Sequence, residues 1–267
     1  MGSSAEWDRT LDELRRRVGR LESGTGGSRH RTVLPFGVAQ LDRLLPGGGL
    51  PLGALHEITP GGPALEHGAA SILFTAGILA RLKGPVLWCL ASRDLFAPAL
   101  ARAGLHPDRV IYAETWREAD LLPVMEEGVR SPVLAGVAAE VGRLSMVASR
   151  RLQLAAEASG AVAVVIRRDR DGGSRAGEGG TACATRWQVS ALPSAPPESL
   201  GLGRARWQVE LTRCRGAPAG AEVGRWVLEA CDEAGRLGVP ADLEHGSGEA
   251  HSAGYAAKGK AARHGRT

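Results

Sequence analysis

The sequence is poor in aromatic residues and in cysteine. Aromatics make up 4% of its 267 residues, so a core drawn from the 43% of hydrophobic residues must be aliphatic and rich in alanine. The four cysteines form neither a CxxC motif nor a zinc-site pattern; they are Cys89, Cys183, Cys214 and Cys231. Because nothing indicates a disulfide scaffold, we expect a reducing compartment.

Long apolar segments are missing as well. Residues 1–20 are charged throughout and lack the apolar core of a signal peptide. Apolar runs elsewhere stop before a membrane-spanning length. These absences predict a soluble, cytoplasmic protein with no membrane attachment. The net charge of +4 permits an acidic partner without requiring one.

The two ends of the chain differ in composition from its centre. In residues 6–22, apolar residues recur at steps of three and four, which predicts an amphipathic helix; they are Leu11, Leu14, Val18 and Leu21. From about residue 246 the chain has almost no large apolar residue and is rich in glycine, alanine and basic residues. We therefore predict a helix and linker at 1–31, a folded domain at 32–240 and a disordered basic tail at 241–267.

Strand and helix patterns alternate within the central part. Short apolar runs indicate strands at 52–58, 85–90, 109–113, 132–138 and 161–166. Helices are expected between them at 69–82, 94–103, 120–129 and 144–159, the last ended by Gly160. This alternation predicts an α/β fold with a mostly parallel sheet and helices on both faces.

Three similar segments in the C-terminal third predict antiparallel strands appended to the parallel sheet. Each begins with an Arg-Trp pair; the pairs are Arg186 and Trp187, Arg206 and Trp207, and Arg225 and Trp226. Because side chains alternate along a strand, the tryptophans can share one face and the arginines the other. Two interpretations stay open. Either the rings cover the sheet above solvated arginines, or these strands bind a partner, since Trp and Arg are enriched at binding hot spots.

Several runs resemble RecA-type proteins. PFGVAQLDRLLPGGGLPLGALHEI at 35–58 resembles the entrance to a RecA-like core, and VLWCLASRDLFAPALARAG at 86–104 resembles its next strand–helix unit. LPFGVAQLD, PGGGLPLGALHE and above all SRRLQLAAEASG at 149–160 are similar to the ImuA family, RecA-like accessory proteins of bacterial damage-induced mutagenesis. The resemblance spans about residues 32–229 and implies a RecA-like fold.

The residues that would hold ATP are degraded. A working phosphate loop reads G-x-x-x-x-G-K-[ST], with a lysine for the phosphates and a hydroxyl for Mg²⁺. Here five residues instead of four separate Gly62 from Gly68, and Ala69 and Ala70 stand at the lysine and hydroxyl positions. Glu66 adds a negative charge where phosphates would lie. We therefore expect no bound cofactor, no metal and no catalytic residue.

The resemblance also locates the remaining catalytic positions. It places Ser92 where the catalytic glutamate belongs, Gly136 or Glu140 near the metal-linked aspartate, and Arg167 at the polar position after the next strand. Losing lysine, hydroxyl, glutamate and aspartate together is hard to reconcile with phosphoryl transfer, which depends on positioning and charge neutralisation.

A basic, glycine-rich segment at 167–180 is the candidate DNA contact. It lacks aromatic residues that would stack on bases, so the functional interpretation is phosphate contact by Arg168, Arg170 and Arg175. An ordinary solvated loop is the alternative.

The ImuA resemblance implies a role in mutagenesis rather than catalysis. The implied partners are ImuB, an inactive relative of Y-family polymerases, and a damage-induced C-family DNA polymerase, with DNA as a further candidate. Two other functions stay open. One is a RecA-like DNA-dependent ATPase or nucleotide-switched recombination factor, and the other is an SOS cell-division inhibitor.

Overall fold

The computed structural model describes residues 32–168, 180–194, 203–216 and 224–241. The helix predicted at 6–22, the tail from 242 onward, Arg170 and Arg175 lie outside these residues. Among the described helices, none is both long and apolar enough to cross a membrane.

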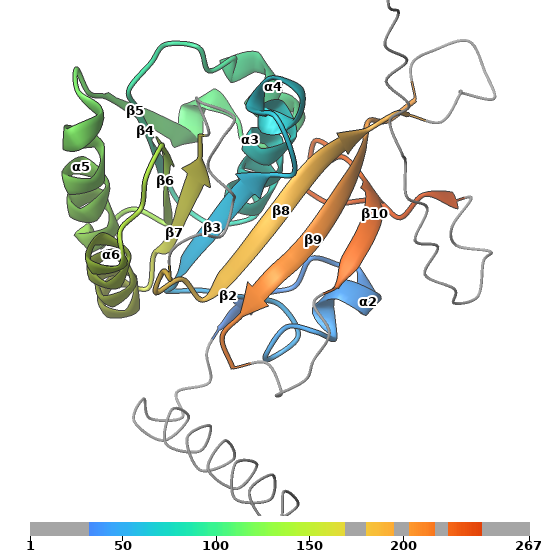
Figure 1. The fold of residues 1–267 in the computed structure, drawn as a ribbon, viewed down its shortest axis with the longest axis horizontal. Helices are drawn as coiled ribbons and strands as arrows, with labels where there is room; N and C mark the ends of the chain where they lie inside the picture. The colour runs from blue at the N-terminus through green and yellow to red at the C-terminus, as the bar shows by residue number, and fades with distance from the viewer. Residues whose placement is uncertain (1–31, 169–179, 195–202, 217–223, 242–267) are drawn as a thin grey trace, which may run out of the picture.

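One eight-stranded sheet organises the fold, in the order β10-β9-β8-β3-β7-β6-β4-β5 (Figure 1). Its parallel strands are β3 (Leu55–Pro60), β4 (Val86–Leu90), β5 (Val110–Glu114), β6 (Gly136–Val141) and β7 (Val162–Arg167). β8 (Thr185–Leu192) pairs parallel with β3, and β9 (Arg206–Cys214) and β10 (Arg225–Glu229) continue antiparallel. β1 (Val33–Leu34) and β2 (Leu50–Pro51) form a separate small sheet. The predicted fold class is confirmed.

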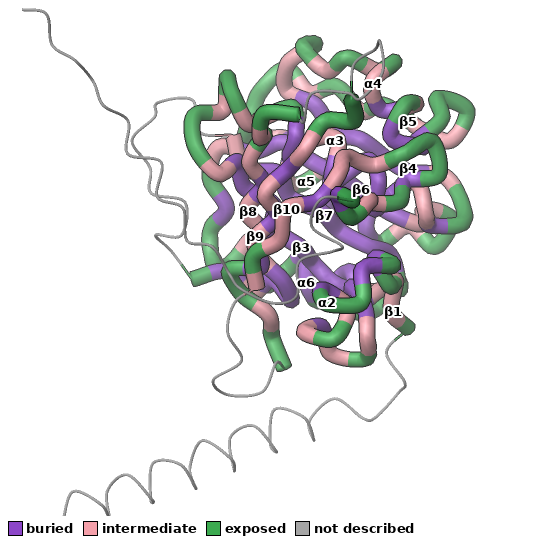
Figure 2. Tube along the Cα trace, turned by 90° about the vertical axis from the view of Figure 1, so that its right-hand side faces the viewer, coloured by how far each residue is buried: buried purple, intermediate pink, exposed green. Residues whose placement is uncertain are grey.

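Helices cover both faces of the sheet and create two cores. α3 (Ala64–Ala80), α4 (Ala97–Arg102) and the short α2 (Ala39–Asp42) lie over one face, and α5 (Glu118–Arg130) and α6 (Met146–Ser159) over the other (Figure 1). A short 3₁₀ turn, Pro107–Arg109, precedes β5. The central strands are buried, and exposure increases toward the loops (Figure 2). α6 ends at Gly160 as predicted, in the left-handed conformation at φ 82°.

Of the predicted boundaries, two differ most from the structure. The strand expected at 132–138 is β6, which begins only at Gly136 and runs to Val141. The helix expected at 69–82 is α3, which begins at Ala64 directly after Pro63. Ala64, Leu65 and Glu66 all favour helix, so the chain turns into α3 before it reaches the residues assigned to a phosphate loop.

The three C-terminal tryptophans lie on one sheet face, as their spacing predicted. Cross-strand pairing puts Trp187 opposite Leu211, and Trp226 opposite Val209. Trp187 and Trp207 are buried against Phe74 of α3, with ring centroids 5.8 and 6.5 Å from it. Phe74, Trp187 and Trp207 therefore form an aromatic cluster at the junction between α3 and strands β8 and β9.

His56 is a fully buried residue of β3 that must stay neutral. Its Nε2 lies 2.9 Å from the Pro51 carbonyl oxygen, which can only accept, so Nε2 carries the proton. Nδ1 then accepts from the Thr185 hydroxyl at 2.8 Å. Burial lowers the pKa of His56 from 6.5 to about 4, although the bond to Pro51 opposes the shift.

This histidine makes the fold acid-sensitive. Its stabilising contribution is complete above pH 6.5 and declines as the pH falls toward 4, because protonation then favours the unfolded chain. We expect a loss of up to about 3 kcal/mol over that window. The measurement is the unfolding free energy against pH for the wild type and a His56→Gln variant. Parallel curves for the two proteins would contradict the assignment.

Candidate functional site

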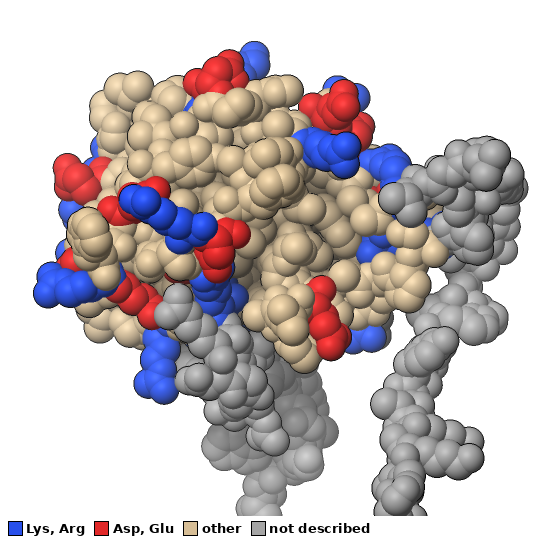
Figure 3. All heavy atoms as spheres, turned by 90° about the horizontal axis from the view of Figure 1, so that it is seen from above, with Lys and Arg blue, Asp and Glu red and all other residues tan. Residues whose placement is uncertain are grey.

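The carboxyl ends of the parallel strands meet at one edge of the sheet, where α/β proteins generally bind ligands. This carboxyl edge is the upper end in Figure 1 and faces the viewer in Figure 3. In the part not covered by grey, much of it is uncharged, and basic and acidic groups lie beside one another. The part of this edge that the structure describes therefore shows no concentrated positive charge of the kind expected around a triphosphate.

The connection from β3 to α3 is too short to enclose a phosphate. β3 ends at Pro60 and α3 begins at Ala64, so only residues 61–63 lie between them. Gly68, Ala69 and Ala70 belong to the helix itself, and Ala70 is buried. The residues that the motif would use for backbone contacts are instead committed to helical hydrogen bonds.

The His67 side chain fills the remaining space at the corner between β3 and α3. A Cβ atom on Gly62 would lie 2.6 Å from the His67 ring, so the ring packs directly on that glycine. Its Nδ1 accepts from the Ala191 backbone N–H at 3.1 Å, which ties the first turns of α3 to the end of β8. On the other side, Gly61 packs against the Ser190 side chain. The corner is thus closed by side chains of the protein.

Arg168 is anchored at the carboxyl edge and does not lie on a free loop. Its Nε lies 2.8 Å from Glu140 Oε2, and its Nη2 lies 2.6 Å from Asp94 Oδ2. Nη1 donates to the Ser92 hydroxyl at 2.7 Å, and Ser92 in turn donates to Asp94. The guanidinium of Arg168, which was predicted as a phosphate contact, is therefore bound to two carboxylates and a hydroxyl of the domain itself.

The contacts of Arg168 bring together Ser92 and Glu140, two of the positions that the RecA resemblance assigned to catalytic residues. Glu140 is the last residue but one of β6, and its side chain is 3% exposed. Trp88 donates to its other oxygen at 3.4 Å. Burial raises the pKa of the Glu140 carboxyl above its usual range, and the Arg168 charge opposes that shift. Glu140 and Ser92 do meet here, but a guanidinium lies where a metal would have to bind.

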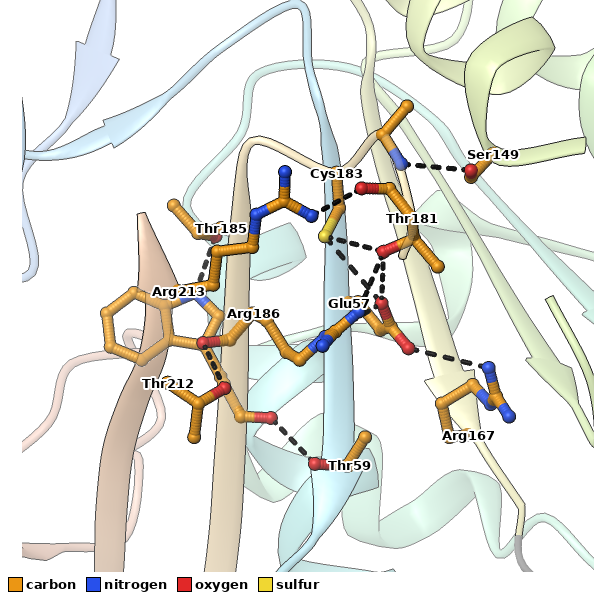
Figure 4. Close-up of polar contacts among 12 residues, drawn as sticks. Glu57, Thr59, Ser149, Arg167, Thr181, Cys183, Thr185, Arg186, Thr212 and Arg213 are labelled. Carbon is orange, nitrogen blue, oxygen red and sulfur yellow. Dashed lines mark hydrogen bonds and ion pairs between the residues drawn. The ribbon is translucent and has the colours of Figure 1, made fainter. Parts of the chain in front are cut away.

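A second polar cluster surrounds Glu57 on β3 (Figure 4). Its Oε2 accepts from Arg186 Nε at 3.1 Å and from the Thr181 hydroxyl at 2.8 Å. Arg167 Nη1 lies 3.5 Å from Oε1, and Arg213 donates to the Thr181 carbonyl. The Glu57 side chain is 4% exposed, so this carboxylate depends on the arginines that surround it.

The Arg-Trp strands are only partly available to a partner. Trp187 and Trp207 are core residues, and Arg186 is bound to Glu57 with its side chain 14% exposed. Arg186 is therefore not a solvated residue, as the first of the two open interpretations would have it. Arg225 pairs with Glu210 at 2.8 Å on the surface, Arg206 is half-buried on the same face, and Trp226 is half-buried on the other.

Sequence reasoning missed Glu57 and Thr181 as determinants of this region. A signal for Glu57 was present, because a carboxylate inside the apolar run LHEI of a buried strand requires a partner. The partners themselves could not be identified, since Arg186 lies 129 residues away.

Comparison with known proteins yields two curated relatives. No protein-family model matches the chain. The chain is 40% identical to Protein ImuA of Caulobacter vibrioides strain NA1000 / CB15N over 212 residues, which cover 76% of this chain and 85% of that protein. Protein ImuA of strain ATCC 19089 / CIP 103742 / CB 15 matches with the same identity and coverage.

Proposed function

The chain belongs to the ImuA family, and from that membership we propose that it is a non-catalytic accessory factor in SOS-induced mutagenic translesion DNA synthesis. It acts by binding other proteins, with DNA as a further candidate ligand. Its proposed partners are an ImuB-type inactive relative of Y-family polymerases and a damage-induced C-family DNA polymerase.

The closed corner between β3 and α3 is the observation that carries this proposal. Phosphoryl transfer needs a loop that cradles phosphates, a lysine and a metal. Here the connection is short, His67 packs on Gly62, and Ala69 and Ala70 stand inside α3. Arg168 neutralises Glu140 from within the protein. These features disfavour the alternative of a RecA-like ATPase.

ATP hydrolysis by the purified protein is expected to stay at the buffer rate, with or without single-stranded DNA. Because the defect lies in the backbone path as well as in two side chains, an Ala69→Lys/Ala70→Thr variant should remain inactive. The measurement is phosphate release. Turnover approaching about 1 s⁻¹, the low end of ordinary enzyme rates, in either protein would overturn the proposal.

The surface arginines of β9 and β10 are the proposed partner contacts. Changing Arg206 or Arg225 to alanine should weaken binding to the ImuB-type protein or to the C-family polymerase by about 2 kcal/mol or more, as at a hot spot. Stability should change little for Arg225, because its exposed ion pair with Glu210 contributes about 0–1 kcal/mol. Titration of each partner, with a melting curve for each variant, measures both effects.

Arg102→Ala on α4 provides the control. Arg102 is an exposed arginine, and α4 covers the sheet face opposite the one that carries Arg206 and Arg225. Unchanged affinity in both β-strand variants would move the contact elsewhere, with the segment at 6–22 as the next candidate. Binding to a division protein and to neither polymerase would favour the cell-division inhibitor.

A further inference from the structure

β5 is an edge strand that neighbouring elements leave largely uncovered. It ends the sheet order, and within the described residues its one extensive neighbour is β4. Ile111 is 52% exposed on the α5 side, and Tyr112 is 38% exposed on the α3 side. Two adjacent large apolar residues are thus exposed on opposite faces of one strand.

The two edge strands of the sheet, β10 and β5, differ in how far they are protected against pairing with another strand. At β10, Glu229 exchanges backbone hydrogen bonds of 2.8 and 3.2 Å with Gly238, and the strand carries charged residues at both ends. β5 has no proline, lysine or bulge, which are the devices that normally prevent edge strands from pairing. An edge of this kind is a template for another strand.

The backbone of β5 defines which groups are available. Thr115 donates to the Leu90 carbonyl of β4, so residues 111, 113 and 115 direct their backbone groups inward. Val110, Tyr112 and Glu114 therefore direct theirs away from the sheet. These three positions are symmetric about Tyr112.

A two-fold axis at Tyr112 gives a complementary antiparallel register. Tyr112 would lie opposite its own copy as an aromatic cross-strand pair. Ile111 would lie opposite the small Ala113, and Val110 opposite Glu114. The only charge on the strand is Glu114, which already pairs with Arg93 at 2.7 Å, so no like charges face each other.

We propose that a second copy of this chain occupies the β5 edge, forming a two-fold dimer in which the two sheets join through antiparallel β5 strands. A contact between two five-residue strands buries less area than a standard interface of about 1,600 Å². We therefore expect a dissociation constant of the dimer in the micromolar range. This inference concerns the chain alone and does not depend on the proposed role in mutagenesis.

A charge swap at the two-fold position tests the proposal with the full-length chain. Tyr112→Lys and Tyr112→Glu each place like charges face to face and should each weaken self-association at least tenfold. Mixing the two variants should restore a heterodimer, because residue 112 then meets the opposite charge. Sedimentation velocity from about 1 to 200 μM, a range that brackets micromolar dissociation, is the measurement.

Leu154→Lys on α6 is the matched control, because it puts the same charge at an exposed apolar residue, 57% exposed, away from β5. It should dimerise like the wild type, and melting curves establish that every variant is folded. A wild type that stays monomeric to 200 μM, a dimer unaffected by Tyr112→Lys, or a mixture that fails to associate would each overturn the proposal.

Discussion

Replacing Trp187 with alanine is expected to lower the free energy of unfolding by about 3–5 kcal/mol, the usual cost of removing a buried aromatic ring. The ring is fully buried, with centroids 5.3 Å from Phe36 and 5.8 Å from Phe74. Its Nε1 donates to the Thr185 hydroxyl at 2.7 Å, and this hydroxyl donates in turn to His56 Nδ1. Truncation would therefore open a cavity and also disturb a buried hydrogen-bond chain.

Urea unfolding of Trp187→Ala beside Trp116→Ala measures this effect. Trp116 is fully exposed, so the same substitution there should change stability by no more than about 0.5 kcal/mol. Equal effects of the two substitutions would mean that Trp187 is not a core residue. In that case its ring would become available again as a partner contact.

The parts of this fold that follow a simple period could be predicted from the sequence. Buried parallel strands appear as continuous apolar runs, so β4 and β7 were located to within one residue at each end. The short apolar run of the edge strand β5 was located equally closely. The alternation in the Arg-Trp segments placed Trp187, Trp207 and Trp226 on one face, because a strand repeats every two residues.

The candidate site could not be predicted to the same degree, because it depends on contacts between distant segments. The motif favoured a loop from Gly62 to Gly68, but local helix propensity starts α3 at Ala64. Arg168 belongs to a basic segment typical of nucleic-acid contacts, but it binds Asp94, 74 residues earlier in the chain. Spacing along the chain contains no information about such pairing.

Removing the Arg168 guanidinium is expected to cost about 3–5 kcal/mol at neutral pH, the penalty for leaving a buried charge without its partner. Glu140 is 3% exposed and has Arg168 as its ion-pair partner, whereas Asp94 is largely exposed and can be solvated. Arg93→Ala is the matched control. Its pair with Glu114 lies on the surface, so its loss should cost about 0–1 kcal/mol.

The pH dependence of the Arg168→Ala variant distinguishes a lost charge partner from lost packing. Without the guanidinium the pKa of Glu140, already raised by burial, should rise further. A carboxyl whose folded pKa is raised favours folding while it is protonated, so the variant should approach wild-type stability in acid and lose it as the pH rises. Adding Glu140→Gln should remove this dependence and recover much of the loss at neutral pH. A penalty that is independent of pH and is not reduced by Glu140→Gln would show that Arg168 acts through its aliphatic stem.

The expected instability of Arg168→Ala also determines how DNA binding by the basic segment should be tested. Such tests should change Arg170 and Arg175 and leave Arg168 intact, because a defect in Arg168→Ala would include unfolding.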